Sequence, residues 1–274
     1  MSDGIDWNPQ AQQMADESMV RNLAAQASCI WPQEEALFQR YGLAEDIRIL
    51  DAGCGTGEIT GRLAQLYSGA TVLGVDILDD HLERARARLA SLASRVHFEN
   101  RSIYRLGLPD RSFDLVVCRH VLQSIPQPES VIAELARVTR AGGRVHVIAE
   151  DYGMMHFPKR TLEPDEFWHL GPKRFGASTG TDLLIGRHAF RHFRAAGLTE
   201  IRVDYVVVDT LRAPRESFAA VWEAWRDGYA EAVAEHTSFT AAEFRAHFDD
   251  MIATLRDPNG YAVWHVPVVS GRVE

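Results

Sequence analysis

The strongest constraint on the fold is a short apolar run that ends in an acidic residue and three closely spaced glycines. Residues 49–60 read ILDAGCGTGEIT, in which Asp51 follows the apolar run and Gly53, Gly55 and Gly57 lead into a helical pattern. Glycines at these positions let a strand turn sharply into a helix and let the backbone approach a ligand closely. We therefore expect a ligand-binding turn here, with a purely structural turn as the alternative.

Strands and helices alternate from residue 47 to residue 149. Short apolar runs, several of them rich in β-branched residues, are separated by segments with apolar side chains at helical spacing. This alternation predicts a parallel sheet that is covered by helices on both faces. The predicted strands are residues 47–50, 71–75, 96–98, 115–118 and 145–149.

The flanking segments predict further elements. Residues 8–31 have apolar side chains at helical spacing, which predicts a helix before the sheet. Residues 151–180 carry prolines, glycines and aromatics without a period, which is typical of a loop, and we expect this loop on the substrate side. The chain then predicts a helix at 187–196, a strand at 201–207, two amphipathic helices and a last strand at 261–269.

The composition excludes several classes of protein. The net charge of −9 over 274 residues provides no positive field for a phosphate backbone, so nucleic acid is not an expected partner. No stretch approaches the roughly 20 apolar residues of a membrane span, and the first ten residues do not resemble a signal peptide. The three cysteines, Cys29, Cys54 and Cys118, form no CxxC pair. We expect a cytoplasmic protein without disulfides, a structural zinc site or a membrane partner.

A second acidic residue ends the second predicted strand. Asp76 follows Asp51 by about one strand–helix–strand step, where a carboxylate can accept both ribose hydroxyls of an adenosine. A nicotinamide-binding fingerprint would place Gly or Ala at position 58, but Glu58 stands there. The chain also lacks the GxxxxGK[ST] pattern of a phosphate-binding loop. These residues favour an adenosine-containing ligand and count against an NAD-dependent oxidoreductase.

Together with the run LPDRSFD at residues 108–114, these features resemble the class I S-adenosylmethionine-dependent methyltransferases, particularly the branch related to quinone-biosynthesis methyltransferases. The resemblance covers residues 47–150 and, weakly, the last strands. It implies an α/β fold: a Rossmann-like, doubly wound, mostly parallel seven-stranded sheet with an antiparallel last strand. The implied divisions are an N-terminal helical cap (1–46), a cofactor-binding core (47–210), a helical insertion over an acceptor pocket (211–258) and the final strand (259–274).

The resemblance also implies roles for single residues. Gly53 and Gly55 would pass under the methionyl part of S-adenosylmethionine, and Asp76 would hold its ribose. Ile77 would pack on the adenine, and Ser102 stands where the family commonly has an Asp that contacts the adenine amino group. The predicted cofactor contacts are completed by Asp51, Cys54, Ile103 and Arg119. The product would be S-adenosylhomocysteine, and no metal is expected.

Methyl transfer from a sulfonium is an in-line displacement, so a hydroxyl acceptor also needs a base that removes its proton. Three candidate bases lie where the fourth and fifth predicted strands end: His120, Glu150 and Asp151. His120 is favoured because imidazole titrates near neutrality. The alternative for His120 is a capping or packing role.

Aromatic residues in the two late helices suggest an enclosed, mostly apolar pocket, and hence a small aromatic or largely apolar acceptor. The candidate acceptor contacts are Tyr152, His156, Trp222 and Trp225, each with core packing as the alternative. Oxygen, nitrogen and carbon methylation all remain open, as does the oligomeric state, including a homodimer. A partner-dependent subunit that binds the cofactor without catalysis is the alternative from another class.

Two further patterns are set aside. Residues 176–180 match the GxSxG nucleophile motif, but no strand is predicted before them, as that motif requires. His188 and His192 have the spacing of metal ligands on a helix, but three arginines surround them and would repel a cation.

Overall fold

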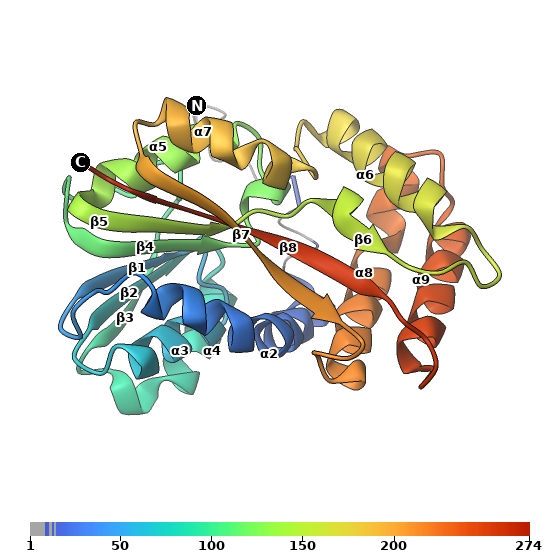
Figure 1. The fold of residues 1–274 in the computed structure, drawn as a ribbon, viewed down its shortest axis with the longest axis horizontal. Helices are drawn as coiled ribbons and strands as arrows, with labels where there is room; N and C mark the ends of the chain where they lie inside the picture. The colour runs from blue at the N-terminus through green and yellow to red at the C-terminus, as the bar shows by residue number, and fades with distance from the viewer. Residues whose placement is uncertain (1–8, 11–12, 14) are drawn as a thin grey trace.

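The computed structural model describes residues 9–274 except 11, 12 and 14, and it contains one eight-stranded sheet with the order β3-β2-β1-β4-β5-β8-β6, in which β7 also pairs with β8. The first five strands are parallel, whereas β8 is antiparallel to both β5 and β7 (Figure 1). The mostly parallel sheet with an antiparallel last strand is confirmed, and the additional strand is the two-residue β6. The strands are β1 (Arg48–Ala52), β2 (Thr71–Asp76), β3 (Val96–Asn100), β4 (Phe113–Arg119), β5 (Thr139–Ile148), β6 (Met155–His156), β7 (Thr199–Asp209) and β8 (Val263–Arg272).

Helices cover both faces of the sheet, as Figure 1 shows. On one face lie α2 (Glu17–Gln39), α3 (Glu58–Leu66) and α4 (Asp79–Arg88), whose buried side chains share a core with β1 and β2. On the other face lie α5 (Pro128–Val138), which packs on β4 and β5, and α7 (Ala189–Ala195), which packs on β7 and β8. The described residues also form four short 3-10 turns: Ala90–Leu92, Leu122–Ser124, Tyr152–Met154 and Ile185–Arg187.

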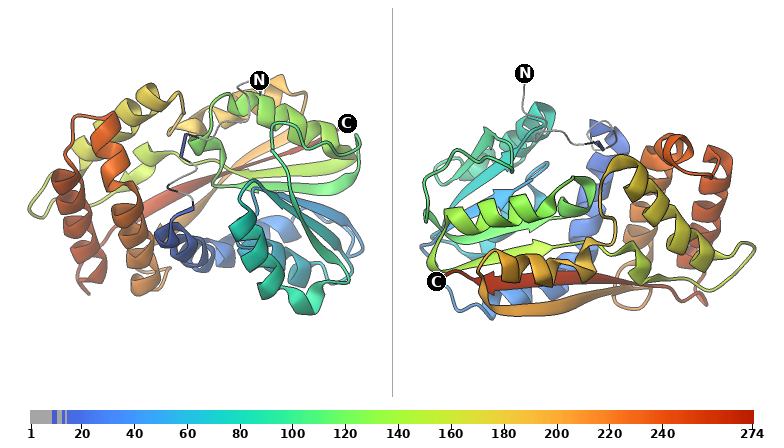
Figure 2. Two further views of the ribbon diagram at one scale, coloured as in Figure 1. Left: turned by 180° about the vertical axis from the view of Figure 1, so that it is seen from behind. Right: turned by 90° about the horizontal axis from the view of Figure 1, so that it is seen from above.

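Three more helices stand together at one end of the sheet (Figure 2): α6 (Pro164–Thr179), α8 (Arg215–His236) and α9 (Ala241–Arg256). The prediction of a loop over residues 151–180 is therefore wrong for the part that forms α6. Pro172 and two glycines obscure the helical period of this segment, but Phe167, Trp168 and Phe175 are buried at helical spacing. Tertiary packing of these aromatics outweighs the weak intrinsic helix propensity.

The N-terminal helix differs from its predicted bounds. Residues 8, 11, 12 and 14 of the predicted helix lie outside the described residues, and α2 begins after Asp16, whose side chain caps it by accepting from the backbone N–H of Ser18 at 2.8 Å. The predicted helix ends at residue 31, whereas α2 continues through Pro32 and ends at Gln39, eight residues later. Buried Trp31 and Phe38 on either side of Pro32 pack against the sheet, which offsets the lost backbone hydrogen bond.

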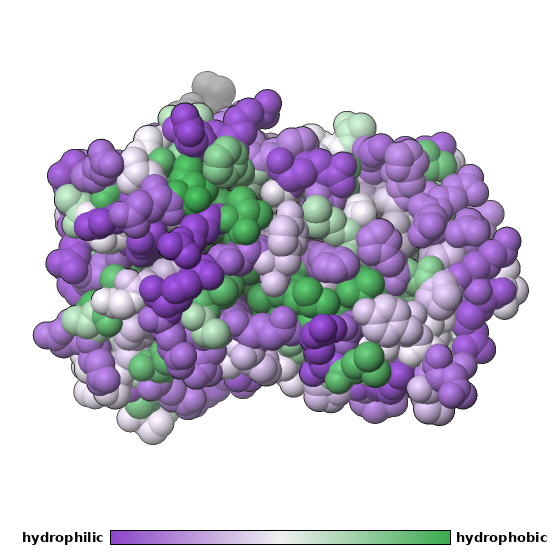
Figure 3. Space-filling model, in the orientation of Figure 1, coloured by the Kyte–Doolittle hydropathy of each residue, from purple (hydrophilic) through white to green (hydrophobic). Residues whose placement is uncertain are grey.

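The face of the molecule seen in Figure 3 is mostly hydrophilic, with apolar side chains in small groups. Among the helices formed by the described residues, none is long and apolar enough to span a bilayer.

Candidate active site

The glycine-rich turn after β1 has a backbone that only glycine adopts readily. Gly53 and Gly55 have φ values of 78° and 51°, in the left-handed region. A Cβ atom at Gly53 would lie 2.5 Å from Cγ2 of Val121, and one at Gly55 would lie 2.8 Å from Cδ1 of Leu23. The backbone N–H of Gly53 donates to the carbonyl of Val75 at 2.8 Å, which joins the turn to β2. The turn therefore brings bare backbone to the carboxyl ends of β1 and β2.

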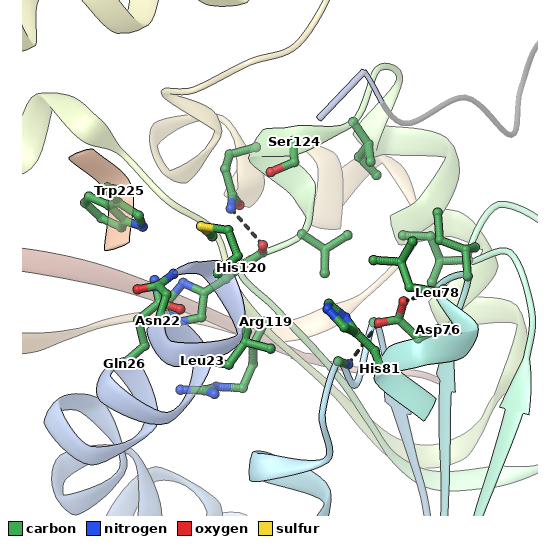
Figure 4. Close-up of a pocket in the computed structure, with 18 of the residues that line it drawn as sticks. Asn22, Leu23, Gln26, Asp76, Leu78, His81, Arg119, His120, Ser124 and Trp225 are labelled. Carbon is green, nitrogen blue, oxygen red and sulfur yellow. Dashed lines mark hydrogen bonds between the residues drawn. The ribbon is translucent and has the colours of Figure 1, made fainter. Parts of the chain in front are cut away.

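A cleft opens at this edge of the sheet, where open α/β sheets bind their ligands (Figure 4). The α2 helix borders it with Asn22, Leu23 and Gln26. Ten of the residues predicted from the sequence line the cleft: Gly53, Gly55, Asp76, Ile77, Ser102, Ile103, Arg119, His120, Tyr152 and Trp225. The structure thus gathers most of the predicted cofactor contacts around one cavity.

Asp76 is held in place from two sides. Its Oδ2 accepts from the backbone N–H of Gly55 at 2.9 Å, and its Oδ1 accepts from that of Leu78 at 3.0 Å. Each carboxylate oxygen can accept a second hydrogen bond, so these contacts orient the group without saturating it. Beside it, Ile77 is 38% exposed and presents an apolar surface to the cleft.

Asp51 and Cys54 lie around a smaller recess, which shares Gly53, Arg119 and His120 with the cleft. Asp51 is buried and accepts from the hydroxyl of Thr60 at 2.6 Å. Burial raises the pKa of Asp51 to about 6, and the Thr60 hydrogen bond opposes that rise. The recess therefore carries a carboxyl group whose charge changes just below neutral pH.

Arg119 belongs to a buried network that the sequence prediction did not include. Its Nε donates to Oε1 of Glu34 in α2 at 2.8 Å, and Nε2 of His146 contacts the same oxygen at 2.9 Å. Nδ1 of His146 in turn contacts the hydroxyl of Tyr41 at 2.8 Å. Burial alone would raise the pKa of Glu34, but Arg119 and His146 together hold it below its usual value. The Glu34 carboxylate is therefore charged and ties α2 to the sheet beside the cleft.

A signal for Glu34 does exist in the sequence. Glu34 lies four residues after Ile30 and four before Phe38, both fully buried, so it interrupts an apolar helix stripe. Such a charged residue requires a buried partner. The partner itself, Arg119, is 85 residues away, and only the fold identifies it.

His120 and Glu150 form a buried pair at the ends of β4 and β5. Nδ1 of His120 lies 2.5 Å from Oε1 of Glu150, and both side chains are buried. His120 has a φ of 56°, which is strained for a residue with a side chain, and Gln123 donates to its backbone carbonyl at 2.8 Å. Its Nε2 lies in the cleft wall and has no hydrogen-bond partner among the described residues. The tautomer in which Nδ1–H donates to Glu150 leaves Nε2 as a hydrogen-bond acceptor.

The third candidate base, Asp151, is engaged elsewhere. Its two carboxylate oxygens accept from Nε and Nη2 of Arg187, each at 2.7 Å, and it does not line the cleft. The predicted bases are thus divided by the structure: His120 and Glu150 meet, and Asp151 forms a separate ion pair.

The predicted acceptor contacts are also divided. Tyr152 and Trp225 line the cleft. Trp222 is fully buried and packs with ring centroids 5.0 Å from Trp225 and 5.9 Å from Trp264, so it is a core residue. His156 is exposed on β6, with its ring 6.0 Å from that of His265, and does not line the cleft.

Among the cleft residues that the sequence prediction missed, two carry buried acceptor atoms. Oδ1 of Asn22 and Oε1 of Gln123 are buried, line the cleft and have no hydrogen-bond partner among the described residues. Buried polar atoms are normally paired, so these two acceptors suit a ligand that carries hydrogen-bond donors. Neither residue belongs to a recognisable motif, and only their position in the fold identifies them.

The two patterns that were set aside lie outside the cleft. Residues 176–180 form the end of α6, where the exposed Ser178 hydroxyl contacts Nδ1 of His236 at 3.0 Å. Nδ1 of His188 contacts Asp182 at 2.6 Å. The part of the chain that the structure describes holds no group of three or more His, Cys, Asp or Glu residues arranged to bind a metal ion.

Comparisons with known proteins agree with this geometry. A family model described as a methyltransferase domain matches residues 43–175. The ubiquinone biosynthesis O-methyltransferase of Pseudomonas fluorescens strain Pf-5 is 33% identical over 199 residues, which cover 64% of this chain and 82% of that protein. Methyltransferase GfsG of Streptomyces halstedii is 36% identical over 115 residues, and the match spans only 41% of its length.

Solved structures share the fold. A phosphoethanolamine N-methyltransferase of Haemonchus contortus, in complex with phosphomonomethylethanolamine and S-adenosylhomocysteine, superposes with a TM-score of 0.62 at 18% identity, over 98% of this chain and 60% of that one. The match to the ubiquinone biosynthesis O-methyltransferase covers most of that protein, and this match identifies the family together with the shared fold. The chain belongs to the class I S-adenosylmethionine-dependent methyltransferases, enzymes that transfer a methyl group from this cofactor.

Proposed function

We propose that this enzyme methylates a hydroxyl group of a small aromatic or largely apolar molecule, with His120 as the general base and Glu150 as the residue that orients it. One observation carries the proposal. Nδ1 of His120 is held by Glu150 at 2.5 Å, whereas the buried Nε2 in the cleft wall has no partner among the described residues. A neutral imidazole with one nitrogen anchored and the other open is the arrangement that general-base catalysis needs.

The residues present fit S-adenosylmethionine. The backbone of Gly53 and Gly55 lines the cleft without a side chain, and Nη2 of Arg119 is buried without a partner among the described residues. In the proposed arrangement, Arg119 binds the methionyl carboxylate and Asp76 binds the ribose hydroxyls, while Ile77, Ser102 and Ile103 surround the adenine. Bound there, the cofactor would supply a methyl group on a sulfonium, which an acceptor oxygen would attack in line, with S-adenosylhomocysteine as the leaving group.

In this proposal His120 removes the proton of the acceptor hydroxyl at Nε2 as the oxygen attacks. Glu150 accepts a hydrogen bond from Nδ1–H, which fixes the tautomer and stabilises the imidazolium that forms. Burial of both side chains excludes water from the pair. A neutral amine acceptor, in contrast, attacks through a free lone pair and does not need a base for that step. The His120–Glu150 pair therefore favours oxygen as the acceptor atom.

The surroundings support an apolar acceptor. Tyr152 and Trp225 border the cleft on the side that faces α6, α8 and α9. In the proposed division of the chain, residues 1–46 cap the cofactor and residues 211–258 form an insertion over the acceptor pocket. Because the chain has a net charge of −9, we propose that the acceptor is a small molecule and not a nucleic acid.

The test is acceptor-dependent formation of S-adenosylhomocysteine with a panel of matched phenols and anilines. We expect turnover of phenols, and a reduction of kcat by at least about 100-fold in His120→Gln, in line with typical general-base contributions. Calorimetric titration with S-adenosylhomocysteine serves as the control for folding and cofactor binding. Anilines methylated as fast as phenols, with no effect of His120→Gln on either, would contradict the proposal.

A further inference from the structure

Four polar side chains form one continuous line of hydrogen bonds that ends at the cleft; we call it the buried network. The hydroxyl of Tyr41, in the turn after α2, contacts Nδ1 of His146 at 2.8 Å, and Nε2 of the same ring contacts Oε1 of Glu34 at 2.9 Å. Nε of Arg119 donates to that same oxygen at 2.8 Å. Of the four residues, only Arg119 lines the cleft. The buried network therefore meets the cofactor site through one guanidinium.

The direction of these hydrogen bonds follows from the charge of the carboxylate. The charged Glu34 can only accept, so Nε2 of His146 carries a hydrogen. In a neutral imidazole Nδ1 is then an acceptor, and the Tyr41 hydroxyl donates to it. The ring of Phe38 stacks on that of His146, with centroids 4.2 Å apart and planes inclined by 23°. The ring of His146 is thus held on its face and at both nitrogens, with its N–H directed at Oε1 of Glu34.

The ion pair between Glu34 and Arg119 departs from the geometry that such pairs frequently have. An arginine and a carboxylate frequently form two parallel hydrogen bonds, one to each carboxylate oxygen. Here the donors of Arg119 and His146 share Oε1. Oε2 of Glu34 and Nη2 of Arg119 are both buried and have no partner among the described residues. A bidentate pair would use both atoms, so the single hydrogen bond leaves one guanidinium nitrogen unused at the cleft.

We infer that His146 is a positioning residue for cofactor binding: its hydrogen bond to Oε1 of Glu34 keeps Nη2 of Arg119 available for the methionyl carboxylate. This inference rests on the proposed function for the place of that carboxylate. Without the N–H of His146, the Glu34 carboxylate can rotate until its two oxygens accept from both Nε and Nη2 of Arg119, the stronger geometry for an isolated pair. The protein's own carboxylate would then occupy the nitrogen that the cofactor needs.

Two ligands that are measured on the same protein test the inference without turnover. S-adenosylhomocysteine carries the methionyl carboxylate, whereas decarboxylated S-adenosylhomocysteine lacks that group alone. Calorimetry gives the Kd of each ligand, and the ratio of the two Kd values reports the carboxylate contact. In the native protein we expect the decarboxylated ligand to bind at least about tenfold more weakly, as for the loss of a hydrogen bond to a charged group. A general loss of stability affects both ligands alike and cancels in the ratio.

Paired variants of His146 separate hydrogen bonding from packing. His146→Leu removes the N–H donor, so the Kd ratio should fall close to one. His146→Gln offers an amide N–H to Glu34 and an amide oxygen to Tyr41, so it should retain most of the ratio. Val72→Ala removes a buried side chain from the core that also contains Phe38, and it should leave the ratio unchanged. A crystal structure of His146→Leu should show Oε2 of Glu34 within hydrogen-bonding distance of Nη2 of Arg119.

The other outcomes separate this inference from the proposed function. Arg119→Lys has a single nitrogen, which stays with Glu34, so this variant should lose the Kd ratio. If Arg119→Lys loses the ratio and His146→Leu keeps it, the proposed cofactor contact stands and the role of His146 is overturned. An equal loss in His146→Leu, His146→Gln and Val72→Ala would show a merely structural effect and would also overturn that role. A native ratio close to one would reject Arg119 as the partner of the carboxylate, and the inference with it, without affecting His120 as the proposed base.

Discussion

Arg119, at the end of β4, donates its Nε hydrogen to Glu34 of α2, 85 residues earlier in the chain. Both side chains are buried, and Nη2 of Arg119 remains without a partner among the described residues. The same carboxylate also contacts His146 of β5. One carboxylate thus fixes the N-terminal helix, the sheet and a guanidinium that borders the cofactor cleft.

Loss of the Glu34 charge should destabilise the protein. Glu34→Gln leaves Arg119 as an uncompensated buried charge, and breaking a buried pair in this way costs about 3–5 kcal/mol. The free energy of unfolding in urea measures this cost. Replacing both partners, as in Glu34→Leu with Arg119→Met, should recover part of the stability. Cofactor binding should still be weaker than in the native protein, because Arg119 is the proposed partner of the methionyl carboxylate. A cost below about 1 kcal/mol for Glu34→Gln would show that the pair contributes little.

Asp76 should determine affinity for the cofactor. Asp76→Ala removes the acceptor proposed for the ribose hydroxyls and releases the backbone N–H groups of Gly55 and Leu78. Hydrogen bonds to a charged group contribute about 1.5–3 kcal/mol each, so the Kd for S-adenosylhomocysteine should rise by at least about tenfold. Asp80→Ala, an exposed acidic residue nearby in α4, is the control. Equal calorimetric Kd values for the two variants would exclude the ribose contact.

Cofactor affinity should fall in mild acid because of Asp51. Burial raises the pKa of Asp51 to about 6, so the carboxylate is charged at pH 7.5 and becomes protonated as the pH falls through 6. If the charged form is needed to bind the positive methionyl amino group, the Kd for S-adenosylhomocysteine should be roughly tenfold higher at pH 5 than at pH 7.5. The neighbouring charges, those of Arg119, Asp76 and Glu34, are present in both the native protein and the control Asp51→Asn. Parallel pH profiles for the two proteins would rule out this role.

Residues at strand ends could be predicted because parallel strands bring their carboxyl ends to one edge of a sheet. This explains why Asp76 and Arg119 border one cleft. The pairing of His120 with Glu150 could not be predicted, since it depends on the register that places Arg119 beside Ile148. The carboxyl-terminal halves of β4 and β5 are mostly apolar. Such strands show no alternation of apolar and polar residues from which the register could be predicted.

Other features depend on contacts between distant segments. Pro172 masks α6 in the sequence, and the helix is stabilised by aromatics of α8 and α9. The same contacts decide that Trp225 lines a cavity whereas Trp222, three residues earlier, is wholly buried. Helical spacing predicts that both lie on an apolar face, but it does not reveal which part of that face borders a void.

Chemical rescue of His120→Gly tests the general-base role most directly. Glycine accepts the φ of 56° at this position, so the variant should fold and leave space beside Glu150 for free imidazole. We predict that kcat for methylation of a phenol falls by at least about 100-fold, with unchanged affinity for S-adenosylhomocysteine, and that added imidazole restores part of the rate. A kcat close to that of the native enzyme without imidazole would contradict the role of His120 as the base.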